Sequence, residues 1–263
     1  MVETVGNRAE PTEKDVEKWV NRVRLGDRRA LARALTLVEN AHPDGGDLVK
    51  AFRRGVEPAY RVGFTGAPGV GKSTLIAGLV TLLRTEDLTV AVLAIDPSSP
   101  ITAGALLGDR IRLQNHVEDS GVYVRSAAGR GHLGGLSSAA PQMAEVLAGA
   151  GFDFLLIETV GVGQSEVEIR DQVDSTVVML TPGWGDSIQM GKAGILEIGD
   201  IYVVNKADQA GSAQTRLDLE RMIHMGPNRS WQPPVLETIA LEEEGIEELW
   251  QAIGAHRRFL GGC

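Results

Sequence analysis

The spacing of apolar residues divides the chain into two parts. Before residue 58, apolar positions recur every three or four residues, which is the spacing of amphipathic helices. Residues that favour helix starts come directly before each apolar stripe, at Thr12, Asp27 and Asp47. The pattern therefore predicts three helices, the first ended by Gly26, the second broken at His42-Pro43 and the third running through Phe52.

Beyond residue 58 the pattern changes to short apolar runs that alternate with helical stretches. Apolar runs without alternation predict strands that are buried on both faces. The expected strands are 60–65, 90–95, 154–157, 176–180 and 201–204, with weaker candidates at 122–124 and 235–239. The expected helices are 73–84 and, approximately, 136–150, 165–172, 190–198, 212–224 and 244–257. This alternation predicts an α/β protein with a mostly parallel central sheet flanked by helices over residues 58–260, preceded by a helical extension over residues 1–57.

The helical extension has two interpretations. It is either an annex that packs over one side of the sheet domain or a module that binds a partner. We favour the annex. The apolar stripes on 12–25 and 27–40 are short enough to be satisfied within it and leave no large apolar face, which also favours a monomer or a weak dimer.

The segment after the first expected strand has the composition of a phosphate-binding loop. It reads Gly66-Ala67-Pro68-Gly69-Val70-Gly71-Lys72-Ser73-Thr74 and leads into an expected helix. Glycines allow the backbone N–H groups to converge on phosphate oxygens, and a helix N-terminus adds its dipole. Lys72 supplies a compact positive charge near the β and γ phosphates, and Ser73 offers a hydroxyl to Mg²⁺. The segment predicts a nucleoside triphosphate site.

A second motif, Asn205-Lys206-Ala207-Asp208, follows the expected strand 201–204 and predicts that the base is guanine. The Asp208 carboxylate can accept hydrogen bonds from guanine N1–H and the 2-amino group, whereas adenine would leave this buried carboxylate unpaired. Lys206 can lie over the base plane, and Asn205 can brace the loop.

Carboxylates at the ends of two other expected strands are candidate Mg²⁺ ligands. Glu158 follows strand 154–157, and Asp96 follows strand 90–95. Asp109 lies in a stretch with loop character and is a third candidate. Gly161 can approach the γ-phosphate through its N–H. With Lys72, these residues form the expected catalytic group.

Two further features concern hydrolysis and switching. Val162 stands where many GTPases place a water-positioning glutamine, and Gln164 is displaced from that position, so we expect slow intrinsic hydrolysis. A long glycine-rich segment, 181–192, is a candidate mobile loop. The residues we expect to switch or to contact a partner are Gln164, Trp184, Asp186, Gln189 and Lys192.

Composition narrows the range of partners. A net charge of −9 and a pI near 5.1 argue against a nucleic acid partner. No apolar run is long enough for a membrane span, and no signal peptide is evident. The single cysteine, Cys263, excludes an internal disulfide and is consistent with a reducing cytoplasm. The five histidines show no ligand spacing, so we expect no transition-metal site.

Together these motifs resemble the MeaB/ArgK/MMAA family, the G-protein chaperones of adenosylcobalamin-dependent acyl-CoA mutases. The resemblance extends from about residue 20 to about residue 257. Its most specific segment is Glu158-Thr159-Val160-Gly161-Val162-Gly163-Gln164-Ser165-Glu166. The other matching segments are 35–39, 63–74, 96–99, 107–109, 130–135 and 205–208.

The resemblance implies a cytoplasmic GTPase of the SIMIBI class that binds GTP and GDP with Mg²⁺. The implied partner is a B12-dependent acyl-CoA mutase of the methylmalonyl-CoA mutase type, whose cofactor loading the protein gates and which it protects or reactivates. An adenosyltransferase is a second candidate partner. The alternatives are a metal-insertion GTPase, which usually carries His-rich or Cys motifs, and a kinase acting on a transport protein, which would use ATP.

Three departures from the family pattern change these expectations. Arg110-Ile111 replace a Lys-Thr pair in the first switch segment. Ile239 replaces a guanine-contacting serine, so of that pair only the Ala240 backbone contact carries over. The arm used for dimerisation is missing beyond Leu260, so we expect a monomer or a weak, nucleotide-dependent homodimer.

Overall fold

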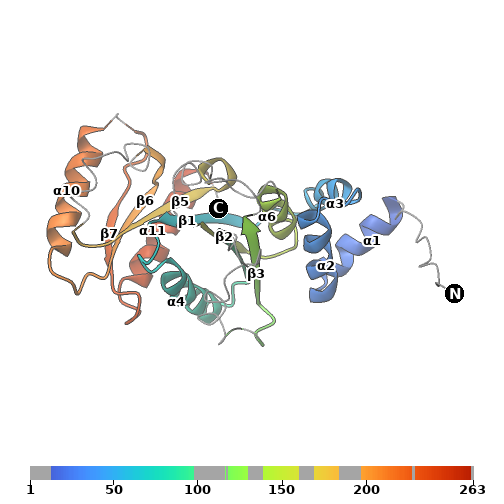
Figure 1. Cartoon of the computed structure of the whole chain (residues 1–263). Helices are drawn as coiled ribbons and strands as arrows, with labels where there is room; N and C mark the ends of the chain where they lie inside the picture. Colours follow the sequence, from blue (N-terminus) through green and yellow to red (C-terminus); the bar gives the residue numbers. More distant parts are fainter. Residues whose placement is uncertain are drawn as a thin grey trace.

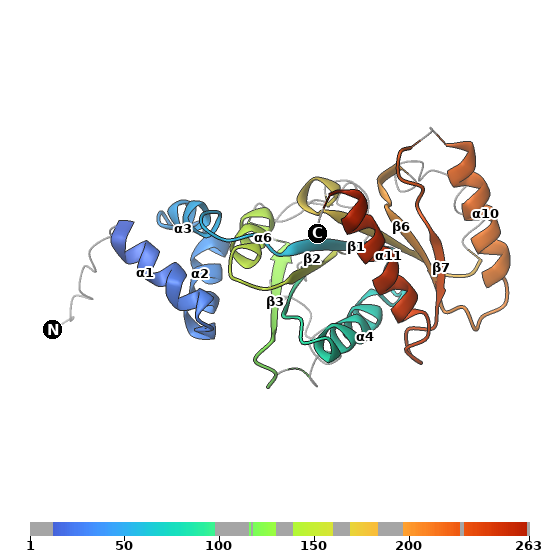
Figure 2. The same cartoon turned by 180° about the vertical axis from the view of Figure 1, so that it is seen from behind.

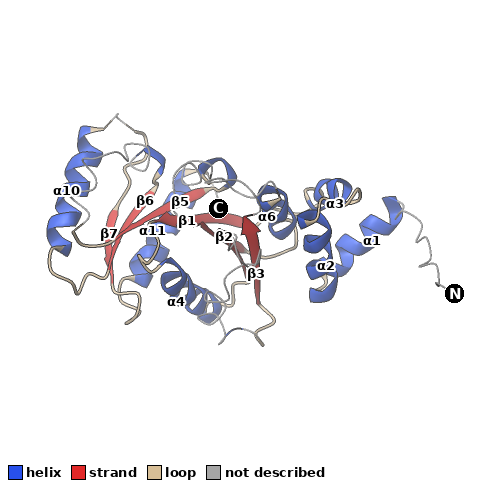
Figure 3. Cartoon of the chain, in the orientation of Figure 1, coloured by secondary structure: helices blue, strands red, loops and turns tan. Residues whose placement is uncertain are grey.

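The computed structural model describes residues 13–97, 116, 118–129, 139–159, 169–183, 197–226 and 229–261. Its centre is one sheet of seven parallel strands in the order β3-β2-β4-β1-β5-β6-β7, with helices on both sides (Figures 1 and 3). The strands are β1 Tyr60–Gly66, β2 Val90–Pro97, β3 Val122–Gly129, β4 Phe154–Thr159, β5 Ser175–Leu180, β6 Ile201–Asn205 and β7 Val235–Thr238. The helices are α1 Glu13–Arg24, α2 Arg28–Glu39, α3 Gly45–Phe52, α4 Lys72–Thr85, α6 Ala140–Ala148, α10 Ser212–Met225 and α11 Ile246–Phe259, with a 3₁₀ turn at Arg170–Gln172. The expected α/β class and parallel sheet are confirmed.

The strand order places β1 at a point where the chain reverses direction across the sheet. From β1 the chain crosses to β2 and β3 on one side, returns to β4 beside β1, and continues through β5, β6 and β7 on the other side. Ligands of parallel α/β sheets bind at such a switch point, outside the carboxyl ends of the strands. The phosphate-binding segment follows β1 and therefore lies at this point.

Neighbouring residues of β2 and β4 contribute to hydrophobic clusters on opposite faces of the sheet. Val92 and Leu156 pack with residues of α4 and α11 on one face. Leu93 and Leu155 pack with residues of α6 on the other face. Because both faces are covered, the strands carry continuous apolar runs, which is why the sequence showed them so clearly.

Helices α2 and α3 pack against α6, and α1 packs against α2 and α3; Figure 2 shows the three at the end of the molecule opposite α10. Their buried residues belong to the same hydrophobic cluster as α6 and one face of β2 and β4. The Arg24 guanidinium donates to the carbonyls of Phe52, Arg54 and Gly149 at 3.2, 2.7 and 3.1 Å, which satisfies backbone acceptors near the ends of α3 and α6. The helices thus share a core with the sheet.

Several sequence-based boundaries need correction. The Asp27 cap is confirmed, because its carboxylate accepts the Ala30 N–H at 3.0 Å. The third helix begins at Gly45, before Asp47. The helix expected at 165–172 is a 3₁₀ turn, Arg170–Gln172, in its described part. The weak candidate at 122–124 is an eight-residue strand, β3, because pairing along the whole of β2 extends it through small residues with little apolar signal.

Among the described helices, none combines the length and apolar character that crossing a lipid bilayer requires.

Candidate nucleotide site

The phosphate loop adopts a backbone that glycine alone accommodates easily. Gly66, Gly69 and Gly71 have φ values of 141°, 79° and 100°. A Cβ at Gly66 would collide with the Met179 carbonyl, and one at Gly71 would collide with the Asn205 amide. The loop therefore lies against β5 on one side and the guanine motif on the other.

Lys72 is the first residue of α4 and is 6% exposed. Its Nζ donates to the Gly66 carbonyl at 2.8 Å and to the Ala67 carbonyl at 3.2 Å. These bonds hold the ammonium group inside the curve of the loop. A positive charge there, at a helix N-terminus, suits an anionic ligand.

Ser73, in the first turn of α4, faces Glu158, near the end of β4. The Ser73 hydroxyl donates to Glu158 Oε1 at 2.8 Å, and both residues are 8% exposed. Their oxygens are hard donors of the kind that Mg²⁺ prefers, so the pair fits the ion that nucleoside triphosphates carry. Glu158 is one methylene longer than the aspartate that most GTPases place here, and the structure shows that it still reaches the serine.

Asp96 lies near the end of β2, which is adjacent to β4 in the sheet. Its backbone therefore lies at the same edge as Glu158, while its side chain is outside the described residues. The other expected site residues outside the described residues are Asp109, Gly161, Gln164, Trp184, Asp186, Gln189 and Lys192.

Asn205 connects three loops through one side chain. Its amide donates to the Val70 carbonyl of the phosphate loop at 2.7 Å. Its Oδ1 accepts from the Thr238 hydroxyl at 3.0 Å and from the Ala240 N–H at 3.1 Å. The predicted bracing role is thus present, with Thr238 as a partner that the sequence did not indicate. The Ala240 N–H, which we expected to face the base, here donates to Asn205.

The remaining residues of the guanine motif lie at the cavity edge. Lys206 has a left-handed φ of 62°, and its Nζ donates to the Gly69 carbonyl at 3.0 Å, which lays its stem along the phosphate loop. Asp208 is exposed, which corrects our expectation of a buried carboxylate. The physical reason is its position three residues beyond the end of β6, at the edge of the cavity.

These elements surround a cavity of about 600 Å³. It is lined by Pro68, Gly69, Gly71, Lys72, Ser73, Thr74, Glu158, Asn205, Lys206, Asp208, Gln209, Ile239, Ala240 and Leu241. The structure therefore brings the phosphate loop, Glu158 and the guanine motif to one cavity, at the carboxyl edge of the sheet.

Leu241 is a cavity residue that the sequence analysis missed. It is 86% exposed although it is a leucine, and it follows directly after Ala240. The Ile239 N–H donates to the Glu244 carbonyl at 3.1 Å, which closes the short loop that presents Leu241. Its sequence signal was an apolar residue before three consecutive glutamates.

We expect Leu241→Ala to raise the Kd for GDP about 5- to 30-fold. A base that covers this side chain would remove its methyl groups from water, and their loss corresponds to about 1–2 kcal/mol. Calorimetry of GDP binding measures the change, with Met225→Ala, another exposed apolar truncation, as the control. An unchanged Kd would show that Leu241 does not contact the base.

A serine–histidine pair at the opposite edge of the sheet is not a second reaction centre. Ser175 Oγ lies 2.7 Å from His256 Nδ1 and 2.6 Å from the Tyr60 hydroxyl, and Ser175 is 0% exposed. Burial lowers the pKa of His256 and favours its neutral form. With no access for a substrate, the cluster is structural and joins α11 to β1 and β5.

Comparison with known proteins agrees with this geometry. The family described as methylmalonyl-CoA mutase-associated GTPase MeaB matches residues 31–263. A protein of Pyrococcus abyssi, named as a GTPase, is 47% identical over 249 residues, which cover 93% of this chain and 77% of the relative. The GTPase ArgK of Escherichia coli is 39% identical over 250 residues, covering 92% of this chain and 76% of the relative. A solved structure described as an LAO/AO transport system kinase superposes with a TM-score of 0.76 at 32% identity, covering 96% of this chain and 78% of that one.

The parallel sheet, the phosphate loop and the guanine motif define the protein as a P-loop GTPase. Within this class, the match over residues 31–263 shows that the chain belongs to the MeaB family.

Proposed function

We propose that the protein is a GTP-hydrolysing chaperone that gates adenosylcobalamin loading onto a cytoplasmic B12-dependent acyl-CoA mutase and protects or reactivates that mutase. The observation that carries the mutase part is the family match over residues 31–263, because the family is described as associated with methylmalonyl-CoA mutase. The site geometry supports the nucleotide part. An adenosyltransferase is a second candidate partner.

Three groups of this chain would act on the nucleotide. Lys72 would hold the β and γ phosphates with the loop N–H groups. Asp208 would select guanine through two hydrogen bonds. Ser73 and Glu158, together with Asp96 and Asp109, would hold Mg²⁺, which neutralises phosphate charge when it is bound.

The Ser73–Glu158 hydrogen bond suggests how nucleotide binding would change the conformation of the protein. The serine hydroxyl is a donor in the described geometry, and a hydroxyl that binds a cation turns its lone pair toward the ion instead. Loading of the nucleotide would then release Glu158 from Ser73. Because Gly161 follows three residues after Glu158, this change would be passed to the segment that we expect to switch.

The proposal is tested with the purified protein and the methylmalonyl-CoA mutase of the same organism. We expect slow GTP hydrolysis by the protein alone and at least tenfold faster hydrolysis when the mutase is added. GTP should also decrease the inactivation of the mutase during turnover, whereas GDP should not. In the variant Gln189→Ala/Lys192→Ala, stimulation should be lost with GTP affinity intact.

The alternatives give different results in the same assay. Transfer of labelled γ-phosphate from GTP to a protein would favour the kinase, and stoichiometric nickel or cobalt binding would favour the metal-insertion GTPase. GTP hydrolysis that the mutase does not change would contradict the chaperone proposal.

A further inference from the structure

The α1–α2 hairpin carries a concentration of positive charge that is unusual for this protein. Between Lys18 and Arg33 the sequence has six basic residues and one acidic residue, Asp27, although the whole chain has a net charge of −9. The basic residues are Lys18, Arg22, Arg24, Arg28, Arg29 and Arg33.

Two of these six residues have structural roles. Arg24 is held by the three backbone carbonyls described above. Arg28 donates to the Asp119 carbonyl at 2.9 Å, and its guanidinium lies 5.6 Å from the centre of the Tyr123 ring. Both therefore attach the hairpin to the rest of the molecule.

The other four basic residues are exposed and form like-charge pairs on their helices, although Arg22 itself lies in the last turn of α1, where the helix dipole favours a cation. Lys18 and Arg22 are four residues apart on α1, and Arg29 and Arg33 are four residues apart on α2, so each helix carries a repelling pair. Arg29 also lies in the first turn of α2, where the helix dipole disfavours a cation, and this turn contains no acidic residue.

Local interactions do not compensate these charges fully. Arg22 pairs with Asp27 at 2.6 Å, and the Arg33 guanidinium lies 5.6 Å from the centre of the Trp19 ring. The side chains of Lys18 and Arg29 make no hydrogen bond or ion pair with any residue in the part of the chain that the structure describes. Charged residues that destabilise their own helix and have no partner within the protein are expected at functional surfaces.

An exposed apolar residue lies next to these charges. Leu25 is 88% exposed at the turn between the two helices. The turn is closed by bonds from the Leu25 N–H to Asn21 and from the Gly26 N–H to Val23, at 3.0 and 2.9 Å, so the leucine is presented on an ordered backbone. Arginine and tryptophan around a buried apolar centre are typical of protein–protein contacts.

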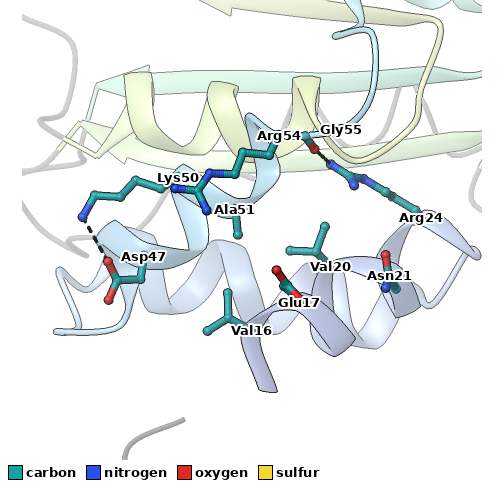
Figure 4. Close-up of a pocket in the computed structure, with 10 residues that line it drawn as sticks. All are labelled: Val16, Glu17, Val20, Asn21, Arg24, Asp47, Lys50, Ala51, Arg54 and Gly55. Atoms are coloured by element: carbon teal, nitrogen blue, oxygen red, sulfur yellow. Dashed lines mark hydrogen bonds and ion pairs between the residues drawn. The ribbon is translucent and has the colours of Figure 1, made fainter. Parts of the chain in front are cut away.

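The cavity on the other side of α1 has a different character. It has a volume of about 440 Å³, lies between α1 and α3, and contains its own charge partners (Figure 4). Lys50 pairs with Asp47 at 3.1 Å, and Arg24 donates to the Arg54 carbonyl, as the dashed lines show. The lining of this cavity thus includes two acidic side chains, Glu17 and Asp47, whereas the segment from Lys18 to Arg33 has Asp27 alone.

We propose that Lys18, Trp19, Arg22, Leu25, Arg29 and Arg33, here called the basic face, form a docking surface for an acidic region of the partner mutase. This proposal rests on the proposed function, which supplies the partner. The helical extension then has both roles considered from the sequence, since its inner side packs on the domain and its outer side binds. Acidic side chains on the partner would supply the charges that α1 and α2 lack, and an apolar recess would cover Leu25.

The test uses the double variant Arg29→Glu/Arg33→Glu of the full chain. Glutamate in the first turn of α2 suits the helix dipole, so this variant should be folded, with unchanged GDP affinity. Its Kd for methylmalonyl-CoA mutase, measured by biolayer interferometry at 50 mM salt, should rise at least tenfold above wild type. Leu25→Ala should raise it about fivefold, and salt should weaken the wild-type complex.

The matched control is Arg221→Glu/Arg258→Glu, which makes the same charge change on exposed parts of α10 and α11 and should alter the Kd less than twofold. If both double variants change the Kd equally, or if neither changes it, the basic face is not the docking surface. The proposed function would still stand in that case, because the wild type binds the mutase. Absence of wild-type binding would overturn both. If the wild type binds a DNA duplex and Arg29→Glu/Arg33→Glu does not, the ligand of the basic face is a nucleic acid. That result would also overturn the proposal.

Discussion

Replacing Lys72 with alanine is expected to lower the rate of GTP hydrolysis at least 100-fold. The ammonium group lies inside the phosphate loop on the carbonyls of Gly66 and Ala67, so its removal takes a buried positive charge from the place where phosphate charge develops. A loss of about 3 kcal/mol of transition-state stabilisation corresponds to this factor. Phosphate release under single-turnover conditions measures the effect, and the wild-type rate should itself lie well below about 10 s⁻¹.

Lys72→Arg is the informative companion to this variant. It keeps the charge but replaces a compact ammonium by a planar group that does not fit the narrow loop. We expect intermediate GDP affinity and hydrolysis close to that of Lys72→Ala. A rate in Lys72→Ala within threefold of wild type would show that Lys72 has no part in the reaction.

The second large effect is a change of base preference in Asp208→Asn. Guanine should keep one hydrogen bond, from N1–H to the new amide oxygen, but lose the charge of the carboxylate and place its 2-amino group against the new amide N–H. Hydrogen bonds to charged groups are worth about 1.5–3 kcal/mol and an unpaired donor adds a cost, so the Kd for GTP should rise more than 100-fold. Xanthine carries a carbonyl in place of the 2-amino group and can accept from the new amide, so XTP should bind more tightly than to wild type.

Calorimetry with GTP, XTP and ATP measures this preference, with ATP expected to remain weak in both proteins. Because Asp208 is exposed, the substitution should leave the fold unchanged. Equal affinity of the wild type for ATP and GTP would contradict the prediction that the site selects guanine.

Most of the fold could be predicted from the sequence, because a buried parallel strand is recognised from its own consecutive residues. Continuous apolar runs such as 154–157 predict strands covered on both faces, and the glycine loop before Lys72 predicts the site. β3 was underestimated because its second half, Ser126 to Gly129, has small residues whose strand character comes from pairing with β2.

Features of the site that depend on distant contacts could not be predicted. Nothing near Asn205 in the sequence indicates Thr238 as its partner, 33 residues away. The exposure of Asp208 and the position of Leu241 depend on how two loops meet after β6 and β7. Whether arginines on one helix find partners is likewise decided by the packing of other elements.

The hydrogen bonds of Asn205 have a consequence for local unfolding. One side chain satisfies the carbonyl of Val70, the hydroxyl of Thr238 and the N–H of Ala240, so separating any one loop leaves polar groups of the others without partners. The two halves of the cavity should therefore open as a single cooperative unit, with matching amide protection at both. Much of the conformational entropy needed to assemble the site is then lost during folding rather than when a nucleotide arrives.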